Sequence, residues 1–355
     1  MKFQSLISKA AILSVSCLVL LFGTACQPDD IGPQTGDSNT DSISDFTNGV
    51  FIINEGNFTW GNGSLSFYEP ESSKAYNHLF DAKNDYPLGD VPQSIRKGKY
   101  DYCLTVNNSN SVVFCDFQMN VIHEFNSIDS PRYTTEDEDG NVYISSLYGK
   151  QILKINKERS QIDTFAYFKE WTEDILWHEE HLYIAQKRFG ETDSIAKNIL
   201  FKLNNLGEKV DSLSIGQDID GIKLVANEKL ALLSNSELQS KIWIIELADF
   251  ESTVKEITGK ASFLSFSGSK NQVYYFKEGI YSFDIASQTE TLIKAVSNKN
   301  SYGFNMDALR SEFYLVDAKD FISKGDLLRY NFEGNLLDSV QLSIIPGEIY
   351  LEHNL

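Results

Sequence analysis

The stretch NEGNFTWGNG, residues 54–63, combines side chains suited to holding a large organic ligand. Asn54, Glu55 and Asn57 can form hydrogen bonds, and Phe58 and Trp60 can cover apolar surface. The apolar run GVFIIN precedes the stretch and the alternating run SLSFY follows it. We therefore expect a loop between two strands, whose polar groups either contact a ligand or satisfy the loop's own backbone.

Similar residues follow apolar runs elsewhere in the chain. Lys187 and Arg188 stand beside Phe189 and form a basic pair, which suits either an anionic group of a ligand or solvent. Further candidate ligand contacts are Asn107, Asn108, Tyr148, Trp171, Asn235, Tyr302 and Asp317.

Motifs that carry catalysis are missing from the sequence. It has no GxSxG elbow, phosphate-binding loop, HExxH helix or paired CxxC motif. The HEEH run at His178–His181 and the EDEDGN run at Glu136–Asn141 fit polar turns better than metal sites. We predict no catalytic residue, no metal site, no covalent cofactor and no enzymatic activity.

A repeated unit of four short strands must position the candidate residues. Units begin at PQSI, PRYTTE, EDILWH, DGIKLVA, SFLSFSG and GFNMDAL. Their period of roughly 40–45 residues is typical of propeller blades. A seventh unit is split, because the C-terminal PGEIYLE resembles an opening strand and GVFIIN, SLSFYEP and KAYNHLF supply the other three. We predict an all-β, seven-bladed β-propeller over residues 49–355, closed by the C-terminal strand.

This arrangement separates two ends of the ring. The turns between first and second strands, and between third and fourth strands, are short and polar. The loops between second and third strands, and the connections between blades, are longer and hold the candidate ligand residues. We therefore expect those residues to converge on one face.

The N-terminal residues predict export and lipidation. Residues 1–25 contain Lys2, Lys9, an apolar run and the small residues GTA just before Cys26, as in a bacterial lipoprotein signal peptide. A plain secretory signal is the alternative. The polar, acidic residues 26–48 predict a flexible tether.

The charge of the chain excludes one class of partner. The formal net charge is -19, and residues 1–25 carry two lysines and no acid, so the remainder carries -19 - 2 = -21. Nucleic-acid binding depends on neutralising phosphates with basic side chains. We therefore expect no nucleic-acid partner.

Cys103 and Cys115 lie symmetrically about Ser109 in YDYCLTVNNSNSVVFCDF. A hairpin centred there would set them side by side, so a disulfide is one interpretation in an oxidising compartment. Two buried strand cysteines are the other interpretation.

Two stretches carry a family resemblance. YCLTVNNSNSVVFCD resembles the YVTN repeat of bacterial YncE-like propellers, and GVFIINEGNFTWGNGSLSFYEP with PLGDVPQSI is similar to the first blade of YncE-like surface lipoproteins of Bacteroidetes. QPDD after Cys26 resembles their surface-export signal.

The resemblance implies a propeller anchored by lipid at the outer membrane and exposed on the cell surface. Such proteins serve a TonB-dependent transporter, and the BtuG-type branch captures cobalamin. We therefore expect capture of a large ligand, with a corrinoid favoured over a ferric siderophore or haem. A protein or glycan scaffold is an alternative, and a propeller lyase or hydrolase is a further one.

Overall fold

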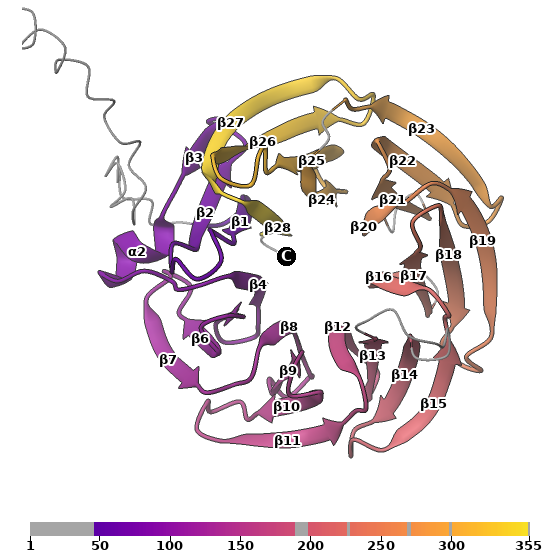
Figure 1. The fold of residues 1–355 in the computed structure, drawn as a ribbon, viewed down its shortest axis with the longest axis horizontal. Coiled ribbons are helices and arrows are strands. Elements are labelled where there is room, and N and C mark those ends of the chain that lie inside the picture. The colour runs from indigo at the N-terminus through magenta and orange to yellow at the C-terminus, as the bar shows by residue number, and fades with distance from the viewer. Residues whose placement is uncertain (1–45, 189–197, 226–227, 268–270, 298–299, 354–355) are drawn as a thin grey trace, which may run out of the picture. The chain divides into compact units, whose positions relative to one another are not determined.

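The chain folds into a ring of antiparallel sheets. The structure, a computed structural model, describes residues 46–188, 198–225, 228–267, 271–297 and 300–353. These residues form seven four-stranded sheets arranged as blades around a central axis, within the unit Gly36–Leu355 (Figure 1). The predicted all-β, seven-bladed propeller is confirmed. The predicted signal peptide and Cys26 lie outside the described residues.

Each blade runs from an inner strand at the axis to an outer strand at the rim. Blade 1 consists of β28, β1, β2 and β3 (Pro346–Leu351, Val50–Asn54, Ser64–Glu69, Lys74–Tyr76). Blades 2 and 3 consist of β4 to β7 (Pro92–Lys97, Tyr102–Val106, Ser111–Cys115, Val121–Asn126) and β8 to β11 (Pro131–Glu136, Val142–Ser146, Gln151–Ile155, Ile162–Tyr167). Blades 4 and 5 consist of β12 to β15 (Trp171–His178, His181–Lys187, Ile199–Asn204, Lys209–Ser214) and β16 to β19 (Asp218–Val225, Lys229–Asn235, Gln239–Glu246, Ser252–Thr258). Blades 6 and 7 consist of β20 to β23 (Ser262–Ser267, Gln272–Phe276, Gly279–Asp284, Thr289–Ala295) and β24 to β27 (Ser301–Asp307, Glu312–Asp317, Lys324–Asn331, Leu336–Ile344).

One short helix, α2 (Leu79–Asn84), interrupts the repeat between blades 1 and 2. Its six residues are too few to show a helical period in the sequence, so the pattern did not predict it. Leu79 and Phe80 are buried against both blades. Within the described part of the chain, no helix is long and apolar enough to cross a membrane.

The predicted closure of the ring is confirmed. β28 pairs antiparallel with β1, with Val50 opposite Leu351 and Ile52 opposite Ile349. Glu348 and Glu352 form ion pairs with Arg96 and Lys97 of blade 2. His353 Nε2 lies 3.4 Å from Asp307 Oδ1 of blade 7. The C-terminal segment thus joins blades 7, 1 and 2.

The core is divided among the seven blade interfaces, each with its own cluster of buried apolar side chains. Successive side chains of a strand point to opposite faces, so a blade contributes to two clusters. Cys103 and Cys115 show this division. Tyr102, not Cys103, pairs with Cys115, so the two thiols belong to different clusters and are free. The expected side-by-side placement is corrected: the hairpin is centred half a residue before Ser109.

The inner strands are joined to one another around the axis. Each has a strand neighbour on one side only, which leaves backbone groups on its other edge without a sheet partner. At all seven junctions, a polar side chain of one inner strand bonds to the backbone of the next, at 2.8 to 3.2 Å. The bonds are Ile95 N to Glu348, Ser94 to Arg132 O, Trp177 N to Thr135, Ile222 N to Asp174, Phe263 N to Asp220, Met306 N to Ser265, and Asn305 to Ile349 O.

Candidate functional site

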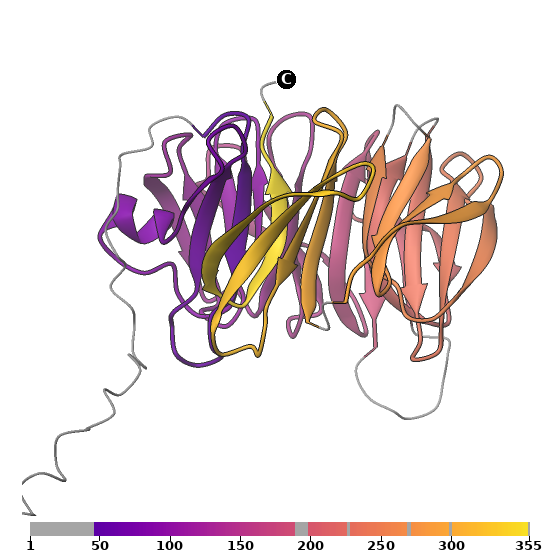
Figure 2. The ribbon, with the colours of Figure 1, turned by 90° about the horizontal axis from the view of Figure 1, so that it is seen from above.

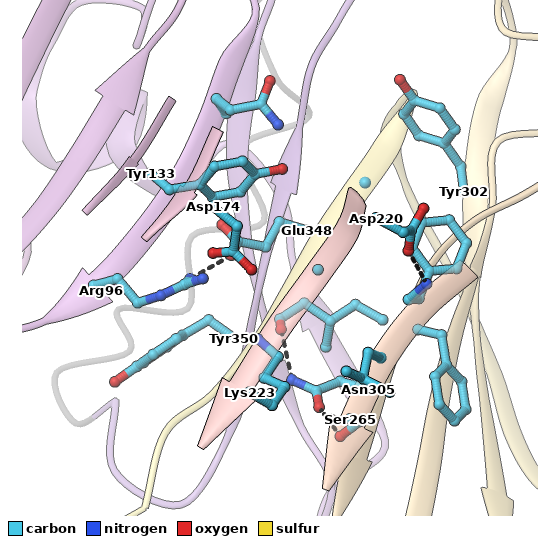
Figure 3. A pocket seen from close by; sticks show the side chains of 18 of the residues that line it. Arg96, Tyr133, Asp174, Asp220, Lys223, Ser265, Tyr302, Asn305, Glu348 and Tyr350 are labelled. Carbon is cyan, nitrogen blue, oxygen red and sulfur yellow. Dashed lines mark hydrogen bonds and ion pairs between the residues drawn. The ribbon is translucent and has the colours of Figure 1, made fainter. Parts of the chain in front are cut away.

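One end of the ring carries the loops between second and third strands and the connections between blades. We call this end the loop face. It is the lower end in Figure 2, opposite the end at which β28 finishes. A cavity of about 710 Å³ runs along the axis between the inner strands and reaches this face. Figure 3 shows side chains that line the cavity, with Tyr133 and Tyr302 on opposite sides.

The cavity lining is highly charged and electrically balanced. It contains four basic and four acidic side chains: Arg96, Arg132, Lys187, Lys223, Glu55, Asp174, Asp220 and Glu348. Asp174, Asp220 and Glu348 accept the junction hydrogen bonds described above, so these carboxylates serve the ring itself. Burial raises the pKa of Asp220, and Lys187 opposes that shift.

Glu55, Tyr302 and Arg132 form a separate group where the cavity opens to the loop face. The Tyr302 hydroxyl donates to Glu55 Oε2 at 3.2 Å. Burial raises the pKa of Glu55, and the nearby Arg132 guanidinium counteracts this only in part. Burial and the Glu55 carboxylate both raise the pKa of Tyr302. Glu55 and Tyr302 are predicted site residues that the fold brings together from blades 1 and 7.

Arg132 is already held from one side. Its Nε donates to Glu173 Oε2 at 2.9 Å, and its Nη1 donates to Gln93 Oε1. Its Nη2 makes no hydrogen bond to any residue within the described ranges. Lys187, another predicted site residue, lines the same cavity and likewise has no ion pair with a described residue.

The loop of residues 55–63 is held firmly by hydrogen bonds. The bonds are Glu55 N to Ile345 O (2.8 Å), Gly56 N to Ile344 O (3.1 Å), Asn57 N to Asn62 Oδ1 (2.7 Å), Thr59 N to Asp90 Oδ2 (3.0 Å), Trp60 N to Asn57 O (3.0 Å) and Gly63 N to Gly89 O (2.9 Å). Gly56 has a φ of +71°, and a Cβ there would lie 2.5 Å from the Asn62 side chain, so the loop needs glycine. Phe58 and Trp60 project from this frame and are 68% and 51% exposed.

Hydrogen bonds connect this loop to the neighbouring blades. Asn57 Nδ2 donates to Phe321 O of blade 7 at 3.2 Å. Asp90, which accepts from Thr59 N, also accepts from the side chain of Asn108 in blade 2. The Tyr302 and Phe321 rings meet edge to face at 5.3 Å. The predicted residues Asn57 and Asn108 therefore fix the relative positions of loops from three blades.

Other predicted residues lie farther from the cavity mouth or support the backbone. Asn54 is fully buried, and its amide donates to Ser66 Oγ at 2.9 Å. Asn107 donates to Pro131 O at 3.3 Å, and buried Asn235 donates to Ala261 O at 3.2 Å. Asp317 accepts from Lys319 N at 2.7 Å. These side chains hold strand ends and loops in place.

The remaining predicted residues lie in blades 3 and 4. Tyr148 is 59% exposed and meets the partly buried Trp171 edge to face at 5.4 Å. Arg188 N donates to Asn198 Oδ1 at 2.9 Å. Phe189, expected beside this basic pair, lies outside the described residues.

The charged residues of the inner strands were missed by the sequence prediction, which considered loops alone. Arg96, Arg132, Asp174 and Glu348 line the cavity, but the repeat pattern identifies their strands without assigning a role to their charges. A signal was present, because the opening strands PQSIRK, PRYTTE and PGEIYL carry charges that a strand packed on both faces would exclude.

Comparison with solved structures supports the fold. A quinoprotein alcohol dehydrogenase-like protein from Bacteroides thetaiotaomicron superposes with a TM-score of 0.66 at 14% identity, covering 86% of this chain and 78% of that chain. Hydrazine synthase of Kuenenia stuttgartiensis has a TM-score of 0.60 at 12% identity, covering 87% and 98%. Virginiamycin B lyase from Staphylococcus aureus has 0.59 at 12% identity, covering 74% and 89%. No known family model and no curated protein matches the sequence.

These likenesses define the class as a β-propeller, and they correct one prediction. We predicted that the chain is not an enzyme, but several structures that share its fold are named as enzymes, including a lyase and a synthase. At this level of identity the likeness shows the fold alone. The fold therefore does not decide whether the chain has an enzymatic activity.

Proposed function

We propose that this chain captures a large organic ligand on its loop face, with a corrinoid such as cobalamin favoured. The loop of residues 55–63 carries the proposal. Six of its backbone N–H groups donate hydrogen bonds, while the Phe58 and Trp60 side chains remain largely exposed. When a ligand covers aromatic rings that a rigid loop holds in solvent, the free energy of the complex is lowered. The loop loses little conformational entropy on binding, because it is already ordered.

The distribution of exposed apolar side chains supports a ligand of considerable size. Beside Phe58 and Trp60 in blade 1, the loop face exposes Phe321 and Ile322 in blade 7 and Tyr148 in blade 3. Only a large molecule can contact loops from several blades at once. A ferric siderophore or haem is the alternative small ligand, and a protein or glycan would meet the same loops in a scaffold.

The proposed setting is the outer membrane. Cys26 carries the lipid, residues 26–48 form the tether, and the propeller is exposed on the cell surface. A TonB-dependent transporter receives the captured ligand. The support is the signal pattern around Cys26 and the resemblance of the first two blades to YncE-like surface lipoproteins.

Calorimetry tests the ligand. Residues 27–355 are titrated with cyanocobalamin, and with a ferric catecholate siderophore for comparison. We expect one-to-one binding of cyanocobalamin. Binding of the siderophore alone would support ligand capture but would identify a siderophore, not a corrinoid, as the ligand. If neither titration produced heat of binding, capture of a corrinoid or of a siderophore would be contradicted, and a protein or glycan partner would be favoured.

Substitution of the exposed tryptophan tests the site. We expect Trp60→Ala to weaken ligand binding about 10- to 100-fold, because a central aromatic contact contributes roughly 1.4–2.8 kcal/mol. The melting temperature should stay unchanged, since Trp60 is half exposed. Tyr100→Ala is the matched control, because Tyr100 is 50% exposed in the turn between β4 and β5, at the end of the ring opposite the loop face. Equal affinity in both variants would contradict a ligand site at this loop.

A further inference from the structure

The polar side chains at the mouth of the cavity include hydrogen-bond donors and acceptors that have no hydrogen-bond partner among the described residues. The junctions between inner strands account for Asp174, Asp220 and Glu348. Glu55 takes no part in those junctions, and its Oε1 has no hydrogen-bond partner among the described residues. Arg132 Nη2 and the Lys187 ammonium are likewise unused within the described ranges. The mouth therefore offers an acceptor on Glu55 and a donor on Arg132, and Lys187 adds a second donor on the cavity wall.

Glu55, Tyr302 and Arg132 form the group at the mouth, and Lys187 lines another part of the wall of the same cavity. The Tyr302 hydroxyl holds Glu55 Oε2 at 3.2 Å and so orients the carboxylate. The positive charge of Arg132, which lines the same cavity, opposes the rise in the pKa of both Glu55 and Tyr302. All four side chains line the same cavity. Glu55 is also the first residue of the aromatic loop, so a ligand on Phe58 and Trp60 is adjacent to the mouth.

The charge around the mouth argues against an ionic guest. Arg132 is neutralised by Glu173, and Lys187 acts electrostatically on Asp220. Glu55 therefore places a negative charge beside an arginine that is already paired, inside a chain whose formal net charge is -19. An anionic group entering at the mouth loses its hydration, meets the Glu55 carboxylate and finds the Arg132 guanidinium already paired with Glu173. A neutral group with both a donor and an acceptor avoids this cost.

We propose that the cavity mouth is a subsite for an uncharged carboxamide group of the captured ligand. The amide N–H donates to Glu55 Oε1, and the amide oxygen accepts from Arg132 Nη2. This inference rests on the proposed capture of a ligand at the loop face, and it names the class of group that the ligand inserts. Tyr302 acts as a positioning residue through its hydrogen bond to Glu55.

Small probes test the subsite independently of the full ligand. Nicotinamide and nicotinate have the same ring and differ in the carboxamide and carboxylate groups. Each is titrated into ¹⁵N,²H-labelled residues 27–355, and the backbone amide signals of Glu55, Tyr302 and Gly347 are followed by NMR. We expect saturable shifts with nicotinamide, and about fivefold or weaker affinity for nicotinate, as the loss of one hydrogen bond to a charged group implies.

Variants separate the subsite from general effects. Glu55→Gln should weaken nicotinamide binding about fivefold, while Glu71→Gln, an exposed glutamate on a turn of the same blade, should leave it unchanged. Thermal melting of both variants verifies the fold. The proposal is overturned by equal or tighter nicotinate binding, by Glu55→Gln binding as wild type, or by no saturable shift with nicotinamide. Any of these results together with calorimetric capture of cyanocobalamin would remove the amide subsite and leave the proposed function standing.

Discussion

A chain that ends at Ile345 will not form a stable propeller. The truncation removes β28, the inner strand of blade 1, and with it the buried Ile349 and the ladder to β1. It also opens two of the seven junctions, those of Ile95 N with Glu348 and of Asn305 with Ile349 O. We expect a loss of more than about 5 kcal/mol, comparable to the whole stability of many domains.

Urea denaturation followed by circular dichroism measures this loss. A chain lacking only residues 354–355 is the matched control, because it keeps β28 and His353. The truncated chain should show no cooperative transition, or one at a much lower urea concentration. A transition within a few tenths molar of the control would mean that the ring holds without its C-terminal strand.

The second large effect concerns a buried ion pair between blades 2 and 3. Arg159 donates to both oxygens of Asp101, from Nε and Nη2, each at 2.9 Å, and both side chains are 3% exposed. Arg159 Nη1 also donates to Gly140 O at 2.8 Å. Asp101→Ala would leave a guanidinium buried without its carboxylate, which costs about 3–5 kcal/mol.

Two comparisons make this prediction specific. The double variant Asp101→Leu with Arg159→Met should recover much of the stability, because it buries no unpaired charge. Glu256→Ala removes an exposed partner of Lys241 and should change the free energy of unfolding by less than about 0.5 kcal/mol. Equal losses for Asp101→Ala and Glu256→Ala would show that the buried pair contributes no more than a surface one.

The period of the sequence was sufficient to predict the blades. Each blade needs four short strands separated by turns, and the same pattern recurs in every blade. Strand length, turn residues and the repeat can all be read directly from the sequence. The split seventh unit was also predictable, because PGEIYLE has the pattern of the other opening strands. The relative position of Cys103 and Cys115 was not predictable from the sequence. A shift of half a residue in the hairpin centre places Tyr102 instead of Cys103 opposite Cys115, so the two cysteines occupy opposite faces of the sheet.

The sequence alone determined the fold class, the closure by the C-terminal strand and the loop face on which Phe58 and Trp60 lie. Only the tertiary structure decided which polar residues are available there. In the sequence, Asn54 and Asn235 are candidate ligand contacts just as Glu55 and Tyr302 are. In the structure, Asn54 and Asn235 are buried and donate to the backbone carbonyl groups of Ser64 and Ala261, whereas Glu55 and Tyr302 meet at the cavity mouth. Hydrogen-bond satisfaction depends on neighbours from other blades, and a single chain segment does not carry that information.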